Sequence, residues 1–494
     1  MDQPGSTDPW APSTGQYYST DPADLFAQLY DAIPDSVFLG WDAMKWNDSA
    51  PVRRQALEIS TAILESGEVD TAHVEELIEE HGPRGMFTVL LGLDWTLIYV
   101  NPYGPAFGDV NLTNLQLRYA ERQLLNSTAV SGALLPRCTF PGRPRGKLDK
   151  AEFFGVHRIP AEQWAKVEHR SVPPELDRHF NRSRPVPVAC APVIETLDEL
   201  KIEFAERHGA AVFTLRPVNS AKLRSRLDTL LYRLDTSGAR IAVLPEGTLS
   251  DSLLRHWRTL IDSRTDDLGT PTGLDFLLVG SGPVGSGQAP TNRAVLLHRH
   301  SGTELLSQDK LNSFTLDPDQ TKLWRLRDAP ATRTAAEYST QGAKIGVLES
   351  SLGRLAILIC EDFVRTAGWE RELLACGVSH LLVPIFSKPI LRYRWEQQSA
   401  ERQAIQLGCW MMVSNSLAVD HAVPIGGLVP DGQAEGSRYS FLVAGPPDPD
   451  SPSYRPRLQF GVAKAGDEPG FVDDADQSQD SRQLPWVYPG AAHD

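Results

Sequence analysis

A thiol, a carboxylate and an ammonium group stand out in this chain by their type, their order and their surroundings. Cys360 directly follows the largely apolar residues 354–359, and Glu246 follows the apolar residues 241–244 after a single proline. Lys310 lies between them in the sequence. A buried strand that ends in such a side chain places it at the carboxyl edge of a sheet, where the sites of layered α/β folds open. Together the three groups can perform covalent acyl transfer, because a base activates the thiol and a cation stabilises the oxyanion.

Each of these residues, taken alone, has an ordinary structural explanation. A cysteine after an apolar run is more often a buried structural thiol than a nucleophile, and most lysines lie on the surface. A glutamate at the end of a strand can simply be solvated. The catalytic hypothesis therefore depends on Glu246, Lys310 and Cys360 occurring together in this order.

The composition bounds the class of protein. The chain has 494 residues, 41% of them hydrophobic, and a formal net charge of −15. A chain this acidic is not expected to bind nucleic acid, and the basic residues of 137–150 are more typical of a solvated loop rich in Pro and Gly. The length predicts about two or three domains with a substantial core.

The cysteines and the terminal sequence indicate where the protein works. Five cysteines without a CxxC pair argue against a disulfide framework or a zinc site. Free thiols are typical of a reducing cytosol. The N-terminus lacks the basic start and apolar stretch of a signal peptide, and no run reaches the roughly 18 apolar residues of a membrane span. We therefore expect a soluble, cytoplasmic protein without a membrane partner.

The first part of the chain shows no pattern of a known family. Residues 1–20 are rich in Pro, Ser, Thr, Gly and Asp and predict a disordered tail. Residues 21–185 predict an accessory region of unknown fold, mixed but mostly helical. The expected helices begin at residues 20–22 and recur at 52–64, 72–80 and 112–125, and the expected strands are 87–91 and 96–100.

From residue 186 the pattern changes to strands that alternate with helices. Apolar runs predict strands at 241–244, 276–279, 294–298, 355–359, 381–384 and 410–414, and helical spacing predicts helices at 223–234, 370–375 and 394–407. Such alternation indicates a layered α/β fold. The acidic residues that follow predict a flexible tail over 466–494.

Residues 186–465 resemble the nitrilase superfamily of carbon–nitrogen hydrolases. The likeness is carried by residues 241–246, 276–280, 292–297, 310–311, 353–362, 376–384 and 413–416. The Cys-Glu-Asp form of residues 360–362 is similar to that of the glutaminase-like branch. Two segments depart from the family pattern, residues 363–365 and residues 403–407, and the second loses charged positions that often brace the fold or the dimer.

The resemblance implies a four-layer α-β-β-α sandwich and a role for each candidate residue. Glu246 would be the general base and Cys360 the nucleophile, while Lys310 and the backbone N–H of Glu361 would bind the oxyanion. Glu337 stands where many relatives carry a second glutamate, and a surface residue on that loop is an equal alternative. The implied reaction is hydrolysis of an amide, a carbamoyl compound or a nitrile through a cysteine thioester, without a metal or organic cofactor.

Two alternatives to this hydrolase stay open. One is a nitrilase-like binding or scaffold protein that uses residues 1–185 as its interaction module. The other is a papain-like hydrolase that pairs Cys360 with His380 or His421, although neither histidine has a supporting motif. As partners, the resemblance implies a small-molecule substrate and a homodimer or a higher homo-oligomer. The loops do not reveal which substrate.

Overall fold

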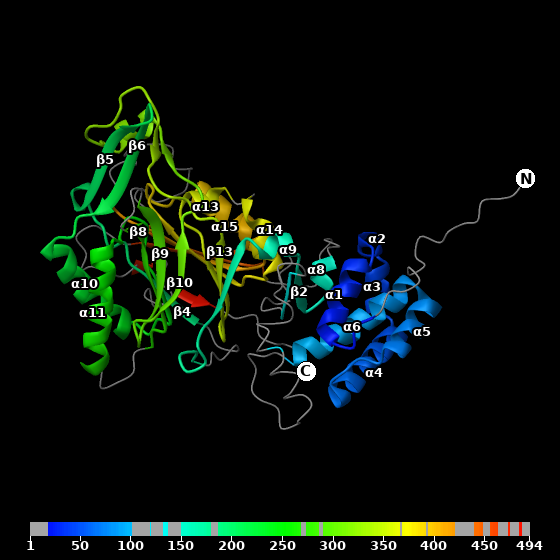
Figure 1. Cartoon of the computed structure of the whole chain (residues 1–494). Helices are drawn as coiled ribbons and strands as arrows, with labels where there is room; N and C mark the ends of the chain where they lie inside the picture. The colour runs from blue at the N-terminus through cyan, green and yellow to red at the C-terminus, as the bar shows by residue number, and fades with distance from the viewer. Residues whose placement is uncertain are drawn as a thin grey trace, which may run out of the picture. The chain divides into compact units, whose positions relative to one another are not determined.

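The computed structural model describes residues 18–100, 119, 132–136, 150–178, 186–267, 273–285, 290–365, 368–391, 394–419, 439–447, 455–462, 473–474 and 484–486. The chain forms two compact units (Figure 1). The first comprises Met1–Ala165 with Ala375–Gly377, and the second comprises Lys166–Leu374 with Val378–Asp494. This division assigns residues 166–178 to the second unit, whereas the sequence predicts a boundary at residue 186.

The first unit is built mainly from helices. They are α1 (Pro22–Ala32), α2 (Asp35–Leu39), α3 (Asp42–Asn47), α4 (Ala50–Ser66), α5 (Thr71–His81), α6 (Pro83–Tyr99), α8 (Lys150–Phe153) and α9 (Ala161–Trp164). Strands β1 (Ala133–Pro136) and β2 (Val156–Ile159) form an antiparallel pair. Helix α1 begins where the sequence predicts, because the Asp21 carboxylate caps the N–H groups of Ala23 and Asp24 and Pro22 lies in the first turn.

Helix α6 occupies a stretch for which the sequence predicts two strands, at 87–91 and 96–100. It runs unbroken over Pro83–Tyr99 and packs against α1, α4 and α5. Its buried apolar side chains are Phe87, Val89, Leu90, Leu91, Leu93 and Leu97. A helix buried on most sides has no clear amphipathic period, so its apolar runs look like buried strands. The two predicted strands are therefore wrong.

The other helices predicted for this unit have different outcomes. Helices α4 and α5 confirm the helices predicted at 52–64 and 72–80. The helix predicted at 112–125 lies outside the described residues, apart from Tyr119.

The second unit contains two large sheets. The six-stranded sheet has the order β10 (Glu304–Asp309), β9 (Thr291–His298), β8 (Phe276–Val284), β7 (Ile241–Val243), β4 (Val186–Cys190) and β20 (Leu484–Trp486). The eight-stranded sheet has the order β19 (Asp473–Asp474), β18 (Arg457–Val462), β17 (Phe441–Gly445), β16 (Trp410–Asn415), β15 (His380–Ile385), β14 (Gly353–Ile357), β13 (Ile345–Ser350) and β3 (Val167–Ser171). The central strands β14, β15 and β16 run parallel, as do β4, β7 and β8.

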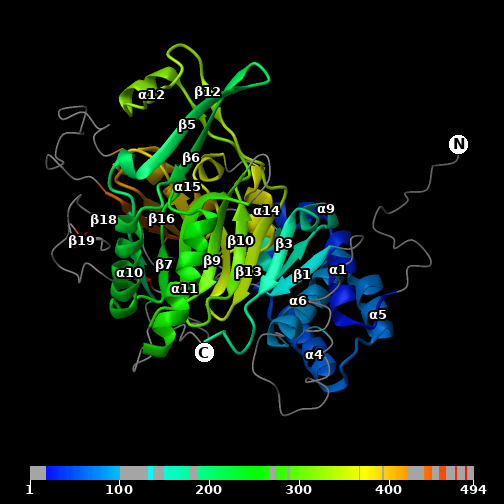
Figure 2. The same ribbon diagram turned by 60° about the vertical axis from the view of Figure 1, so that its left-hand side comes forward.

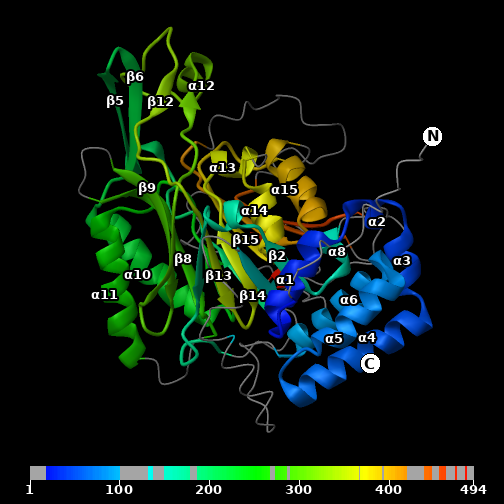
Figure 3. The ribbon, with the colours of Figure 1, turned by 45° about the vertical axis from the view of Figure 1, so that its right-hand side comes forward.

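The two sheets pack against each other and carry helices on their outer faces. Helices α10 (Ala221–Thr236) and α11 (Asp251–Asp267) lie on the six-stranded sheet and share a core with its strands. Helix α15 (Trp395–Gln406) lies on β16 and β17 of the eight-stranded sheet, and α13 (Glu361–Val364) packs against α15. Figure 3 shows these four layers in succession. The predicted four-layer α-β-β-α sandwich is confirmed.

The central strands are largely apolar because both faces of each sheet are covered. In β7, all three residues are fully buried, and the same holds for the apolar positions of β14. Strands buried on both faces read as continuous apolar runs rather than as an alternation. This is why the sequence predicts the strands that precede Glu246 and Cys360.

A third, four-stranded sheet lies at one end of the sandwich (Figure 2). Its order is β11 (Thr315–Leu316), β12 (Ala335–Glu337), β6 (Ala210–Pro217) and β5 (Leu200–Arg207). Strands β5 and β6 form an antiparallel hairpin, and β12 runs parallel to β6. Helix α12 (Pro318–Leu323) follows β11 and is closed at its start by a capping box between Asp317 and Gln320.

Three short strands lie outside the range predicted for the sandwich. Strand β3 pairs with β13 in parallel, although residues 167–171 belong to the stretch predicted as the accessory region. Strands β19 and β20 come from residues 466–494, the predicted flexible tail, and pair with β18 and β4. Edge strands are held by backbone hydrogen bonds and need no buried apolar pattern, so the sequence gives little sign of them.

Candidate active site

Glu246 lies just beyond β7, at the carboxyl edge of the six-stranded sheet. Its backbone N–H donates to the carbonyl of Ile385 at 3.3 Å, which ties it to the end of β15 in the facing sheet. Gly247 follows with a φ of +82°, and a Cβ there would lie 3.3 Å from the side chain of Leu215. The glutamate is 3% exposed. The turn therefore directs a buried carboxylate into the space between the sheets and the hairpin.

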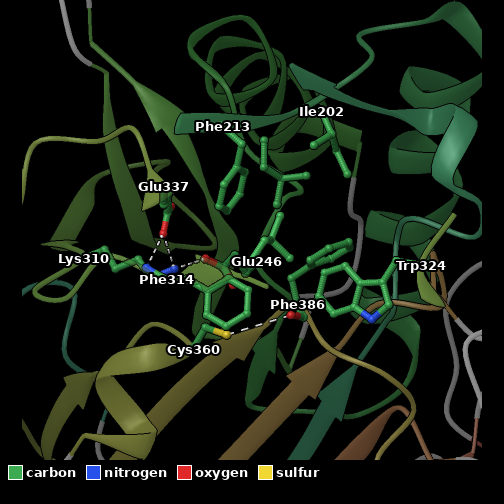
Figure 4. A pocket seen from close by; sticks show the side chains of 11 residues that line it. Ile202, Phe213, Glu246, Lys310, Phe314, Trp324, Glu337, Cys360 and Phe386 are labelled. Atoms are coloured by element: carbon green, nitrogen blue, oxygen red, sulfur yellow. Dashed lines mark hydrogen bonds and ion pairs between the residues drawn. The ribbon is translucent and has the colours of Figure 1, made fainter. Parts of the chain in front are cut away.

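Lys310 follows β10 and reaches the same carboxylate. Its Nζ donates to Glu246 Oε1 at 2.8 Å and to Glu337 Oε2 at 2.7 Å (Figure 4). The lysine is 2% exposed. Burial by itself would lower the pKa of Lys310, but the negative charges of Glu246 and Glu337 outweigh it and hold the pKa well above its usual value. Lys310 is therefore a fixed cation between two carboxylates.

Glu337 is the last residue of β12, and its side chain is buried rather than solvated. Its Oε2 accepts hydrogen bonds from Lys310 and, at 3.2 Å, from the backbone N–H of Phe314. Its Oε1 accepts from Asn292 Nδ2 at 2.7 Å. Only 8% of the side chain is exposed. The alternative of a surface glutamate at this position does not fit the structure.

Asn292 connects the two glutamates, a role that the sequence did not reveal. Its Nδ2 donates to Glu246 Oε1 at 2.8 Å and to Glu337 Oε1 at 2.7 Å. Its backbone carbonyl accepts from the N–H of Lys310 at 2.8 Å. The position of this residue at the start of β9 was the available signal, since an amide there faces the end of the neighbouring strand. One amide group thus holds both carboxylates and the lysine backbone.

Cys360 lies three residues beyond β14, at the carboxyl edge of the eight-stranded sheet. Its φ of +47° and ψ of −98° are rare for a residue with a side chain. A non-glycine residue in such a conformation costs about 1–3 kcal/mol and persists only where the surrounding structure enforces it. Here the Cys360 N–H donates to the carbonyl of Pro384 at 3.0 Å, and Sγ lies 3.9 Å from the carbonyl oxygen of Phe386. The bend between strand and helix places the sulfur in the cavity that Glu246 and Lys310 also line, beside the carbonyl of Phe386 (Figure 4).

The surroundings of Cys360 keep its thiol protonated in the resting site. Burial raises the pKa of Cys360, the carboxylate of Glu246 raises it further, and Lys310 lowers it in part. The net pKa lies well above the usual value. A thiol in this setting becomes a nucleophile only when a base removes its proton during attack, and Glu246 is the carboxylate whose charge acts most strongly on its pKa.

The two residues that follow Cys360, Glu361 and Asp362, have separate roles. Glu361 begins α13, so its N–H has no acceptor within that helix and is the donor next to Cys360. Asp362 is buried and accepts hydrogen bonds from the backbone N–H groups of Leu311 and Asn312. Burial raises the pKa of Asp362 to about 6. Asp362 therefore fastens the segment after Lys310 to the helix after Cys360, a connection that sequence spacing does not reveal.

Glu246, Lys310, Glu337 and Cys360 line one cavity (Figure 4). The empty space in and in front of the cavity amounts to about 340 Å³, open solvent included. Its remaining lining residues are all apolar: Ile202, Phe213, Leu215, Phe314, Leu316, Trp324 and Phe386. A concave apolar site with a few convergent polar groups is the usual form of a small-molecule site.

His380, one of the two histidines proposed as alternative partners of Cys360, does not line this cavity. His380 is buried at the start of β15, and its Nδ1 lies 2.6 Å from the hydroxyl of Ser379. The backbone N–H of Cys360 donates a hydrogen bond to the carbonyl of Pro384. Pro384 lies four residues after His380 on the same strand, which separates these two residues by about 13 Å. His421 lies outside the described residues. Nothing in the described part of the chain supports the papain-like alternative.

Among the described residues, no helix combines the length and the apolar character that crossing a membrane requires. The same residues contain no group of three or more His, Cys, Asp or Glu side chains placed to hold a metal ion.

Comparisons with known proteins find similarity only among solved structures. No protein-family model and no curated protein matches the chain. An amidase from Nesterenkonia sp. matches with 18% identity and a TM-score of 0.36, over 62% of this chain and 93% of that one. A mutant of the Nesterenkonia AN1 amidase, from the nitrilase superfamily, matches with 19% identity and a TM-score of 0.37, over 62% and 94%.

A third match is a Saccharomyces cerevisiae protein from branch 10 of the nitrilase superfamily. It shows 11% identity and a TM-score of 0.34, over 60% of this chain and 92% of that one. These names agree with the resemblance seen in the sequence. At such identities and TM-scores they carry no conclusion about the function of this chain.

Proposed function

We propose that this protein hydrolyses a non-peptide carbon–nitrogen bond, in an amide, a carbamoyl compound or a nitrile, through a thioester on Cys360. The supporting observation is the buried Lys310 ammonium, which bonds Glu246 and Glu337 in the cavity that Cys360 also lines. A base, a cation and a thiol in one enclosed space are the groups that covalent acyl transfer requires.

In the first step, the Cys360 thiol attacks the substrate carbon while Glu246 takes its proton. The transfer leaves Glu246 neutral and creates negative charge first on sulfur and then on the oxygen of an amide or carbamoyl substrate, or on the nitrogen of a nitrile. The Lys310 ammonium and the backbone N–H of Glu361 stabilise that oxygen, and one such donor contributes about 3–4 kcal/mol to the transition state. Because Lys310 is already fixed by two carboxylates, little reorganisation accompanies the step.

In the second step with an amide or a carbamoyl substrate, Glu246 returns the proton to the leaving nitrogen and ammonia or an amine departs. A nitrile instead gives a thioimidate, to which one water molecule adds before ammonia departs. The acyl group then remains on Cys360 as a thioester. Glu246 next takes a proton from water, and the resulting attack releases the carboxylic acid and restores the thiol. Glu337 and Asn292 keep Glu246 and Lys310 in place throughout.

The test is a hydrolysis screen of the full-length protein that measures ammonia release. We expect release from at least one member of a panel of aliphatic amides, ω-amides, carbamoyl compounds and nitriles. Cys360→Ala should abolish it, and Cys409→Ala, which removes a buried thiol in another part of the fold, should not. Hydrolysis retained by Cys360→Ala would remove the cysteine from the mechanism. Silence of the whole panel would favour the binding or scaffold alternative.

The assembly and the location of the protein are proposals of the same kind. We propose a homodimer or a higher homo-oligomer in the cytoplasm, because the resemblance in the sequence implies the first and the free cysteines suit the second. Light scattering of the purified chain would measure the assembly, and a monomeric mass at micromolar concentration would contradict it.

A further inference from the structure

We propose that the four-stranded sheet binds the acyl group of the substrate and that this acyl group is apolar. The substrate is then an aliphatic or aromatic amide or nitrile rather than an amino-acid amide such as glutamine. This inference rests on the hydrolase function proposed above and names its substrate class. The supporting observation is which strands line the cavity.

The wall of the cavity opposite the catalytic groups comes largely from the four-stranded sheet. Ile202 lies on β5, Phe213 and Leu215 lie on β6, and Leu316 lies on β11. Phe314 directly precedes β11. One small sheet, separate from the two sheets of the sandwich, therefore supplies most of the surface that an acyl group would touch.

The β5–β6 hairpin has one apolar face and one charged face. Ile202 pairs with Leu215 and Phe204 pairs with Phe213 in the antiparallel register, so these four side chains share a face. The residues between them point the other way. There, Lys201 and Arg216 form ion pairs with Glu203, and all three are exposed. Because side chains alternate between the two faces of the hairpin, the four apolar side chains lie on the face turned toward the cavity.

The charged groups that the described residues place in the cavity already bond one another and offer no counter-charge for a charged substrate tail. Among the described lining residues, the charged ones are Glu246, Lys310 and Glu337, and these bond one another and Asn292. An α-ammonium or α-carboxylate group bound against the hairpin would be buried without a counter-charge, which is costly. An apolar acyl group has no such cost.

The same sheet also holds Glu337, the glutamate that positions Lys310. Glu337 pairs with Phe213 in the parallel ladder between β12 and β6, and the N–H of Tyr338 donates to the Phe213 carbonyl at 2.7 Å. An acyl group that packs on Phe213 thus packs on the strand that positions Glu337. Selection of the acyl group and alignment of the lysine are connected through one backbone ladder.

The experiment measures kcat/KM for the full-length protein with acetamide, propionamide, butyramide, hexanamide, benzamide, glutamine and asparagine. Each methylene that the cavity buries should raise kcat/KM about fourfold until the cavity is full. Glutamine and asparagine should fall at least roughly 100-fold below butyramide, because each would bury an unpaired charge. Ammonia release from none of these or the other panel compounds would refute the hydrolase function itself.

Two variants test the wall directly. Ile202→Ala and Phe213→Leu enlarge the cavity and should move the preferred acyl chain toward hexanamide by severalfold relative to acetamide. The matched control is Phe204→Leu, on the same face of the hairpin but outside the cavity lining, which should keep the wild-type preference. Glutamine hydrolysed better than butyramide, or variants that match the control across the series, would overturn the inference while leaving the hydrolase function intact.

Discussion

Removal of the Asn292 side chain should impair catalysis more than it impairs folding. Asn292→Ala deletes the amide that donates to Glu246 Oε1 at 2.8 Å and to Glu337 Oε1 at 2.7 Å. Glu246 Oε1 keeps Lys310 as a donor, and so does Glu337 Oε2. Glu337 Oε1 loses its Asn292 donor. A hydrogen bond to a charged group contributes about 1.5–3 kcal/mol.

That loss sets the expected change in rate. If it appears fully in the transition state, kcat/KM should fall roughly 10- to 150-fold, since 1.36 kcal/mol corresponds to a factor of ten. The fall should lie mainly in kcat, because Asn292 does not line the cavity and holds the groups that react rather than the acyl group. Because Asn292 acts through the two glutamates, it is a positioning residue.

The assay combines ammonia-release kinetics with the rate of Cys360 alkylation by iodoacetamide over a range of pH. The control is Asn219→Ala, which removes a part-buried amide bonded to Ser252, away from the cavity. We expect Asn292→Ala to change both kcat and the pH profile of alkylation, and Asn219→Ala to change neither. Equal kcat values for Asn292→Ala and the wild type, with both proteins folded, would refute the view that this amide organises the site.

Three further substitutions test the buried charges. Glu396 is buried, and its Oε2 has no hydrogen-bond partner among the described residues. Burial raises the pKa of Glu396 to about 7. The carboxyl therefore contributes to the stability of the folded state below pH 4.5 and loses this contribution as the pH rises through 7. Glu396→Gln should therefore be more stable than the wild type by up to about 3 kcal/mol at pH 8 and equal to it at pH 4, as measured by urea unfolding, and no gain at pH 8 would refute this. Arg354→Met leaves the buried Glu349 without its main cation and should cost about 3–5 kcal/mol at pH 7. The charge of Arg354 helps to lower the pKa of Glu349 to about 2. The loss of stability in Arg354→Met should therefore shrink as the pH falls from 4.5 toward 2. A loss of stability that does not depend on pH would contradict the pairing of Arg354 with Glu349. Lys310→Met leaves two buried carboxylates without a cation and should lower kcat at least roughly 100-fold, with thermal stability partly restored at acidic pH, whereas unchanged ammonia release would exclude Lys310 from the reaction.

The catalytic candidates were accessible from the sequence because of where the chain places them. Glu246 and Cys360 follow strands that are buried on both faces, and such strands are visible as largely apolar runs. The structure brings both to one cavity with Lys310 and Glu337. The position of Asn292 near the start of a strand was a signal, but the hydrogen bonds of Asn292 and Asp362 were not accessible, because they join segments that lie far apart in the chain.

Parts of the fold escaped prediction for different physical reasons. Helix α6 is apolar on most of its surface, so its period could not separate a helix from two strands. The β5–β6 hairpin did carry a signal, because Ile202 and Phe204 alternate with Lys201 and Glu203. What the alternation could not show was that its apolar face lines the cavity, since that depends on pairing with β12.

The most direct test of the mechanism is acid-quenched mass spectrometry of the full-length protein during turnover of an amide that it hydrolyses. We predict a mass increase equal to the acyl group, located by peptide mapping at Cys360 and absent from Cys360→Ala. The adduct should disappear on treatment with hydroxylamine, as a thioester does. Steady ammonia release without any acyl adduct, or an adduct on Cys190 or Cys409 in place of Cys360, would contradict the account.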